Sequence, residues 1–240
     1  MNLNSKIAIV TGASSGTGKN FCTSLVEKGS LVYGLARSSD KLAALREELG
    51  ETFIPVTLDI SNITAIDEWV SKTFNEQHTP DILVNNAGVA FFGNVDELPV
   101  EDWHTMMNTN LNGVFYLTRK IVPLMKANPS VCHIVNIVSV AGLLGNPQIS
   151  GYNATKFGLR GFSEALFKEL RYDGIKVTAF FPGSINTELF DNIDSVTTHQ
   201  NMMTTQNISD TLIFILETPD NYLINELTMR PLDPRPPKSE

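Results

Sequence analysis

The strongest constraint on the fold of this sequence is a regular alternation of short apolar segments with longer segments of helical periodicity. The apolar segments are almost continuously hydrophobic, which is typical of parallel strands covered on both faces. Helices between successive strands imply right-handed crossovers, so we predict an α/β fold with a doubly wound parallel sheet of about seven strands flanked by helices. Strands are expected at 7–10, 31–35, 53–58, 82–84, 131–138, 177–181 and 222–228, and helices at 18–28, 40–49, 63–76, 100–126, 152–172 and 208–217.

Length and composition fit one globular domain. The chain has 240 residues, of which 42% are apolar and 18% charged, and its formal net charge is −8. This composition argues against disorder, and the negative charge argues against a general attraction to nucleic acid or to an anionic membrane. We therefore expect a single domain at 1–230 and a proline-rich tail at 231–240 that is extended or frayed.

Signals for secretion, membrane insertion and metal binding are missing from the sequence. Without a leader or a long apolar span, we expect a cytoplasmic protein. Cys22 and Cys132 lie far apart in apolar segments and are expected to be buried free thiols. The four histidines have no ligand spacing, so we expect no metal site.

A polar segment at 184–206 interrupts the alternation. It follows the sixth predicted strand, at the carboxyl edge of the sheet where open α/β folds bind their ligands. A segment of this length without periodicity is either a functional lid or a disordered insertion, and its position favours a lid.

Directly after the first predicted strand comes a glycine-rich turn, Thr11-Gly12-Ala13-Ser14-Ser15-Gly16-Thr17-Gly18. Spaced glycines allow a sharp turn and a close approach to a ligand, and the helix behind them directs unpaired N–H groups at a phosphate. A plain strand-to-helix turn would need only one glycine. The turn therefore indicates a nucleotide-binding site.

The end of the second predicted strand indicates which nucleotide binds. It reads Leu35-Ala36-Arg37-Ser38, without the acidic residue that accepts the ribose hydroxyls in NAD sites. Arg37 could pair with a 2′-phosphate and Ser38 could donate a hydrogen bond to it, although Arg37 could also be an ordinary solvated cation. We predict NADP(H) rather than NAD(H).

Tyr152 and Lys156 stand four residues apart in a predicted helix and so share one face of it. A Tyr-x-x-x-Lys pair alone is a weak motif. Here Ser139 follows the strand at 131–138, Asn110 lies in the helix at 100–126, and Asn85-Asn86-Ala87-Gly88 ends the fourth strand.

In this order the motifs resemble the short-chain dehydrogenase/reductase family, over nearly the whole chain. The resemblance implies a single-domain Rossmann fold, a homodimer or homotetramer, and a catalytic tetrad of Asn110, Ser139, Tyr152 and Lys156. The sequence departs from the family pattern at Thr17, where a branched aliphatic residue is usual, and at Thr155, where serine is usual. The implied and predicted cofactor contacts are Gly12, Ser14, Ser15, Gly16, Thr17, Gly18, Arg37, Ser38, Asp59, Ile60, Asn86, Ala87, Gly88, Tyr152, Lys156, Pro182, Gly183, Ile185 and Thr187.

The chemistry of these side chains fits carbonyl reduction. Tyr152 would give a proton to the substrate oxygen, and Lys156 would lower the pKa of that phenol and donate to the nicotinamide ribose. Ser139 would stabilise negative charge developing on the oxygen. By the family resemblance, Asn110 would hold a water that links Lys156 to solvent.

The predicted substrate pocket is apolar and has no evident cation, which favours a moderately apolar carbonyl or alcohol. We expect an oxidoreductase that transfers a hydride between NADP(H) and a carbonyl or secondary alcohol. Alternatives are a 3-oxoacyl-thioester reductase or a 3-hydroxy-acid dehydrogenase, which segment 224–231 resembles in part, and a non-catalytic NADPH-binding regulator, against which the complete tetrad counts. The predicted pocket residues are Phe91, Leu143, Leu144, Phe190 and Met202.

Overall fold

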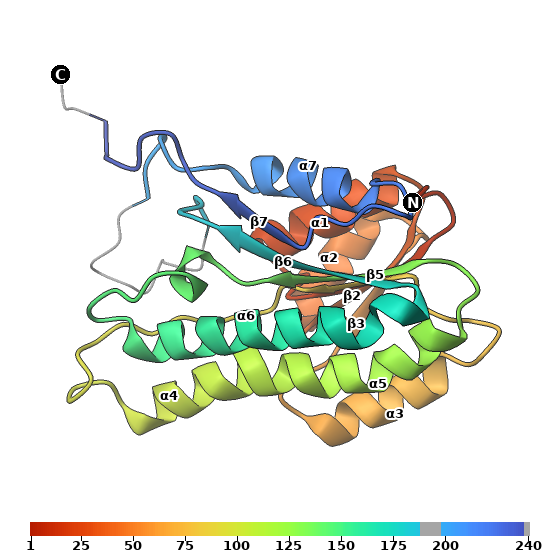
Figure 1. The fold of residues 1–240 in the computed structure, drawn as a ribbon, viewed down its shortest axis with the longest axis horizontal. Helices are drawn as coiled ribbons and strands as arrows, with labels where there is room; N and C mark the ends of the chain where they lie inside the picture. The colour runs from red at the N-terminus through yellow and green to blue at the C-terminus, as the bar shows by residue number, and fades with distance from the viewer. Residues whose placement is uncertain (188–197, 238–240) are drawn as a thin grey trace.

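Seven parallel strands form one sheet in the order β3-β2-β1-β4-β5-β6-β7 (Figure 1). The computed structural model describes residues 1–187 and 198–237. The fold class predicted from the alternating pattern is confirmed. The strands are β1 (Ile7–Thr11), β2 (Leu31–Ala36), β3 (Phe53–Thr57), β4 (Ile82–Asn85), β5 (Cys132–Ile137), β6 (Ile175–Pro182) and β7 (Glu226–Met229).

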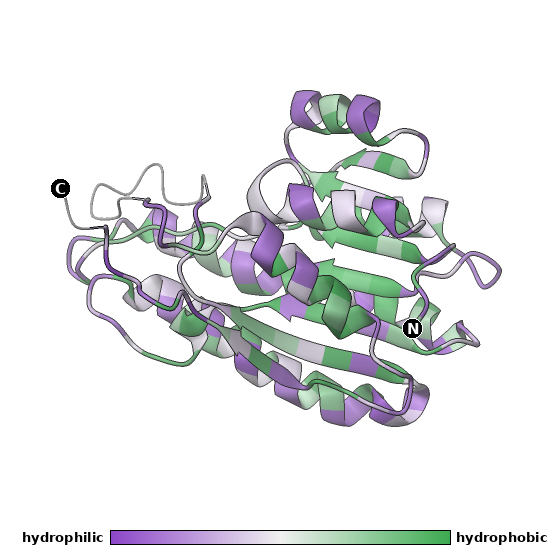
Figure 2. Cartoon of the chain, turned by 90° about the horizontal axis from the view of Figure 1, so that it is seen from above, coloured by the Kyte–Doolittle hydropathy of each residue, from purple (hydrophilic) through white to green (hydrophobic). Residues whose placement is uncertain are grey.

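Helices cover both faces of this sheet (Figure 1). One face carries α1 (Gly16–Glu27), α2 (Ser39–Leu49) and α7 (Thr205–Leu216). The opposite face carries α3 (Ile63–Thr73), α4 (Val100–Met107), α5 (Gly113–Ala127) and α6 (Ser150–Leu170). Figure 2 shows the inner strands coloured mainly hydrophobic between helices that mix apolar and polar residues. None of the helices in the described ranges combines the length and the apolar character that crossing a membrane requires.

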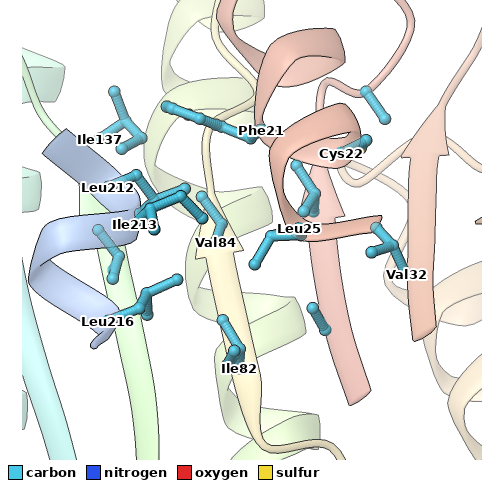
Figure 3. Packing of buried hydrophobic residues seen from close by; sticks show 14 of the residues in the cluster. Phe21, Cys22, Leu25, Val32, Ile82, Val84, Ile137, Leu212, Ile213 and Leu216 are labelled. Carbon is cyan, nitrogen blue, oxygen red and sulfur yellow. The ribbon is translucent and has the colours of Figure 1, made fainter. Parts of the chain in front are cut away.

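The core between α1, α7 and the sheet is built from aliphatic and aromatic side chains. Figure 3 shows Phe21 and Leu25 of α1 and Leu212 of α7 packed against Val84 of β4. Cys22 belongs to the same cluster, and Cys132 lies on the other face; both are buried and unpaired, as predicted. Burial raises the pKa of each thiol, so neither is a nucleophile near neutral pH.

The sheet changes direction between β1 and β4. β1 pairs with β2 on one side and with β4 on the other, so the chain leaves β1 and β4 toward opposite sides. The loops that follow these two strands therefore diverge and leave a crevice at the carboxyl edge.

The predicted helices differ from the structure by one to three residues at one or both ends, and two of the differences have a clear local cause. The helix expected at 100–126 is interrupted by a π-helical turn, Asn108–Asn112, between α4 and α5. The turn is followed by Gly113, where a Cβ would lie 2.8 Å from the Ile60 carbonyl oxygen, so only glycine permits this close approach. The helix expected at 63–76 ends at Thr73, because Asn75 and His78 pair in a tight turn.

The last strand was predicted too early, at 222–228. β7 begins only at Glu226, because the carbonyls of Pro219 and Tyr222 turn away to accept hydrogen bonds from Lys176 Nζ. The predicted tail has neither helix nor strand in its described part, 231–237, and the Arg235 carbonyl accepts a hydrogen bond from Asn201.

The segment predicted as a lid is described at its two ends, and residues 188–197 lie outside the described ranges. Ile185 forms a bridge with Met203, so the two ends lie together. The segment is also shorter than predicted, because Thr204 caps α7 through a capping box with Asn207 and the helix begins at Thr205.

Candidate active site

A cleft of about 350 Å³ opens at the carboxyl edge, between the loops after β1 and β4. It is lined by every predicted cofactor contact except Gly18, and also by Ser139. Sequence reasoning missed the other lining residues, which are Leu35, Ala36, Leu58, Val89, Thr109, Ile137 and Val138. Apart from Val89 and Thr109 they lie at strand ends or directly after a strand, where the only available signal was the end of an apolar run.

The glycine-rich turn forms one wall of the cleft. Gly12 and Gly16 have φ angles of +70° and +52°, which favour glycine. Gly18 does not line the cleft, but a Cβ there would lie 2.0 Å from the Gly12 carbonyl oxygen, so it allows α1 to pack onto the turn. The N-cap Ser15 makes no side-chain hydrogen bond to the helix, and the first turn of α1 holds no acidic residue. The positive end of α1 therefore remains available to an anion.

Two threonines fasten this turn to the loop after β4. Thr11 Oγ1 accepts hydrogen bonds from the backbone N–H groups of Asn86 and Ala87, each at 2.9 Å. Asn86 Nδ2 donates to the Thr11 carbonyl at 2.9 Å, and Thr17 Oγ1 donates to Asn86 Oδ1 at 2.8 Å. Thr17, where the family usually has an aliphatic residue, thus satisfies the one side-chain acceptor of Asn86.

Arg37 and Ser38 lie at the end of β2, and both are exposed on the wall of the cleft. Among the described residues, the Arg37 guanidinium has no hydrogen-bond or ion-pair partner. Asp59 follows β3, and its Oδ1 accepts from both the backbone N–H and the hydroxyl of Ser61. The cation at this end of the cleft is therefore free to meet an anionic ligand.

Tyr152 and Lys156 lie in the first two turns of α6, and both are buried. Lys156 Nζ lies 5.5 Å from the centroid of the Tyr152 ring and donates to the Ile137 carbonyl at 3.0 Å. Burial raises the pKa of Tyr152 to about 12, and burial lowers the pKa of Lys156 to about 8. The expected fall of the tyrosine pKa is thus not seen in the protein itself, because desolvation of the phenolate dominates.

Ser139 has a strained backbone, with φ at +131°. Its Oγ accepts a hydrogen bond from the Ala141 N–H at 3.1 Å, so its single proton is left to be donated. A hydrogen bond from Ser139 also acts on Tyr152, where it lowers the phenol pKa against the larger effect of burial. The Ser139 hydroxyl therefore lies beside the phenol of Tyr152 on the wall of the cleft.

Asn110 is buried in the π-helical turn and does not line the cleft. Its Oδ1 accepts from the Val89 N–H, and its Nδ2 donates to the Val89 carbonyl, each at 2.9 Å. Nδ2 also donates to Thr155 Oγ1 at 3.2 Å, and the Thr155 hydroxyl donates to the Tyr152 carbonyl. The side chain of Asn110 thus holds the loop after β4 against α6.

The predicted substrate residues do not line this cleft where the structure describes them. Phe91 packs in a cluster with Tyr152, and Leu143 packs against β6. Leu144 is 48% exposed, Met202 is partly buried, and Phe190 lies outside the described residues. Their assignment to a substrate pocket stays a prediction.

Comparison with known proteins decides the family. The short chain dehydrogenase family model matches residues 6–197, which is most of the chain. The chain belongs to the short chain dehydrogenases. An oxidoreductase of uncharacterised activity from Staphylococcus haemolyticus is 33% identical over 231 residues, covering 96% of this chain and 99% of its own.

Two solved structures resemble this short chain dehydrogenase closely. A closed form of serine dehydrogenase complexed with NADP⁺ has a TM-score of 0.84 and 31% identity, covering 94% of this chain and 95% of its own. A 3-ketoacyl-(acyl-carrier-protein) reductase from Brucella melitensis complexed with NADH has a TM-score of 0.84 and 27% identity, covering 94% of this chain and 97% of its own. This short chain dehydrogenase is therefore an oxidoreductase with a Rossmann-like fold.

Proposed function

We propose that this short chain dehydrogenase transfers a hydride between NADP(H) and a carbonyl or secondary alcohol, with Tyr152 as the general acid or base. The observation that supports it most is that Tyr152, Lys156 and Ser139 share the wall of a cleft with the glycine-rich turn. A protein that binds a nucleotide without turnover would not need these three groups together.

The cleft fits a dinucleotide cofactor. The uncapped first turn of α1 suits the pyrophosphate. A Cβ at Gly12 would lie 2.9 Å from Ala87 Cα, so the glycine lets the turn and the loop after β4 pack closely beside this position. Asp59 and Ile60 border the adenine end, and Pro182, Gly183, Ile185 and Thr187 border the nicotinamide end. The bound nicotinamide supplies or accepts the hydride.

NADP(H) is favoured over NAD(H) by the end of β2. Within the described ranges Arg37 has no ion-pair or hydrogen-bond partner, and Ser38 offers a hydroxyl and a backbone N–H. The sequence has no carboxylate at this position that could repel a 2′-phosphate. One of the two similar structures holds NADP⁺ and the other NADH. We therefore base the choice of NADP(H) over NAD(H) on Arg37.

Four residues of the chain have separate roles in the proposed reaction. Ser139 donates a hydrogen bond to the substrate oxygen, and Tyr152 gives that oxygen its proton during reduction. Lys156 donates one N–H to the Ile137 carbonyl, and its other two N–H groups would donate to the ribose of the cofactor. Asn110 keeps the loop after β4 in place, and it is also proposed to hold a water that resupplies protons to Lys156.

A second candidate activity is favoured by the similar structures. The two similar structures are a serine dehydrogenase and a 3-ketoacyl-(acyl-carrier-protein) reductase. Serine is itself a 3-hydroxy acid, and a 3-ketoacyl thioester carries its carbonyl at the same carbon. We therefore keep a 3-hydroxy acid or 3-oxoacyl thioester as the alternative substrate class. A homodimer or homotetramer in the cytoplasm is part of the same proposal.

The decisive experiment is a substrate panel followed by NADPH absorbance. It should include simple ketones, a 3-oxoacyl thioester and, in the reverse direction, 3-hydroxy acids. Tyr152→Phe should lower turnover by about 10²- to 10⁴-fold, because it removes the proton and keeps the ring. The control is Tyr172→Phe, whose side chain is 83% exposed and should leave turnover unchanged. NADPH binding without turnover on any compound would refute the proposal and favour a regulator.

A further inference from the structure

The loop after β5 is too exposed to be held in place by burial of its own side chains. It starts at Ser139 on the wall of the cleft and runs to Ile149, just before α6. Residues 144–148 are exposed and have no regular helix or strand. A loop tip with so little burial would move freely unless polar contacts held it.

Asn153 provides that anchor. It lies directly after Tyr152 on α6, and it is only 7% exposed. Its Nδ2 donates to the carbonyls of Ala141 at 2.6 Å and Leu144 at 2.8 Å, and its Oδ1 accepts from the Asn146 N–H at 3.1 Å. Both side-chain protons and the acceptor are therefore used on one loop.

The same contacts reach the Ser139 hydroxyl. Ala141 donates its N–H to Ser139 Oγ, and its carbonyl is the one that Asn153 holds at 2.6 Å. A Cβ at the next residue, Gly142, would lie 2.8 Å from the Lys156 carbonyl oxygen, so the loop rests on the backbone of α6. A change at Asn153 would therefore shift Ser139 relative to Tyr152.

We propose that Asn153 is a positioning residue that fixes the loop 139–146 on α6, and with it the Ser139 hydroxyl and the Leu143–Leu144 side of the substrate site. Asn110 holds the loop after β4 in the same way, through Val89. The Gly93 N–H donates to the Gln148 carbonyl at 2.7 Å and joins the two loops. The inference rests on the proposed function, because it assigns the substrate side of that site.

Asn153→Ala removes all three hydrogen bonds, whereas the cofactor contacts come from other elements. The Kd of NADPH should stay within about twofold, while kcat/KM should fall by about 10- to 100-fold, as expected for reacting groups displaced by about 1 Å. The ratio of kcat/KM for butanone and acetophenone should move toward one, because the freed loop discriminates less by size. Asn153→Asp keeps the shape but sets an oxygen against two carbonyls, so its loss should be at least as large.

The matched control is Asn75→Ala. Asn75 Oδ1 also holds a turn through two backbone N–H groups, but it does so between α3 and β4, at the opposite edge of the sheet. This variant should keep wild-type kcat/KM and the wild-type substrate ratio.

Hydrogen exchange gives a second readout that needs no turnover. Peptides covering 140–149 should exchange faster in Asn153→Ala, whereas peptides covering 12–20 should not change. Unchanged exchange at 140–149, or wild-type kcat/KM and substrate ratio in the folded variant, would overturn the inference. Failure of the wild type to reduce any ketone with NADPH would refute the proposed function instead. The hydrogen-exchange measurement would still decide whether Asn153 holds the loop.

Discussion

At the residue scale, one physical effect moves the pKa values of Tyr152 and Lys156 in opposite directions. Burial disfavours the charged form of each group, so the pKa rises to about 12 for the phenol and falls to about 8 for the ammonium. Tyr152 is therefore fully protonated near neutral pH, which suits an acid. Lys156 keeps its charge only below about pH 8.

These directions predict a pH profile for reduction with NADPH. Because Tyr152 holds its proton throughout, kcat/KM should be level below about pH 8. Above that value Lys156 loses its proton, and with it the donor to the ribose and the cation beside the phenol, so the rate should fall by up to tenfold per pH unit. The Kd of NADPH, measured across the same range, separates lost binding from lost catalysis. A rate that climbs between pH 8 and 10 would contradict this assignment.

Thr17 offers a second test at this scale. Thr17→Val keeps the shape but leaves Asn86 Oδ1 without its donor, beside an anionic cofactor. One lost hydrogen bond is worth about 1 kcal/mol, so the Kd of NADPH should rise about fivefold while kcat changes little. Thr17→Ser should retain the wild-type Kd. The matched control is Thr211→Val, whose hydroxyl donates to the Asn207 carbonyl on the exposed side of α7. Equal Kd values in all four proteins would remove Thr17 from the cofactor site.

Residue type and spacing were sufficient to predict that Ser139, Tyr152 and Lys156 lie at one edge of the sheet, because that edge follows from strand direction alone. The roles of Thr11 and Asn153 could not be predicted in this way. Each acts on backbone atoms of a distant loop, and the position of those atoms depends on tertiary packing. Asn153 lies between Tyr152 and Lys156 in the sequence, but the Tyr-x-x-x-Lys spacing does not show that its amide faces Ala141 and Leu144.

At the scale of elements, periodicity predicted where helices and strands occur but not how they are interrupted. A π-helical turn at Asn108–Asn112 changes the helical register while leaving the apolar pattern on either side intact. Its Asn110 amide reaches Val89, a contact that periodicity does not encode. The late start of β7 has a similar cause, since it is set by one buried lysine on β6.

That lysine, Lys176, joins β6 to the connection between α7 and β7. Its Nζ donates to the carbonyls of Pro219 at 2.5 Å and Tyr222 at 2.6 Å, and more weakly to Thr218, between α7 and β7. Lys176→Met keeps the apolar stem and leaves these acceptors unpaired, so the free energy of unfolding should fall by about 3 kcal/mol in urea denaturation. Lys168→Met, which breaks only an exposed ion pair with Glu164, should cost less than about 1 kcal/mol. Equal stability of the two variants would show that the Lys176 contacts contribute little.

At the scale of the whole molecule, the net charge of −8 opposes a polyanionic cofactor, and only local features can compensate. The N-terminus of α1, the exposed Arg37 and the buried Lys156 all line the same cleft. The alternating pattern predicted the class of sheet, but strand order depends on long-range pairing that no local segment encodes. Because the fold has one domain, we expect the substrate to be selected by loops at the carboxyl edge of the sheet.

The cleft is bounded by loops from both halves of the sheet, so cofactor binding should stabilise the domain as one unit. At a concentration of 100 times Kd, a ligand adds about 2.7 kcal/mol, which for a chain of this size raises Tm by about 5–10 °C. NADPH should give this shift in a single transition in thermal denaturation, and NADH at the same concentration should give a clearly smaller one. Arg37→Ala should bring the two shifts together, because the cation that meets the 2′-phosphate is gone. A preference for NADPH that survives Arg37→Ala would show that Arg37 does not select the cofactor.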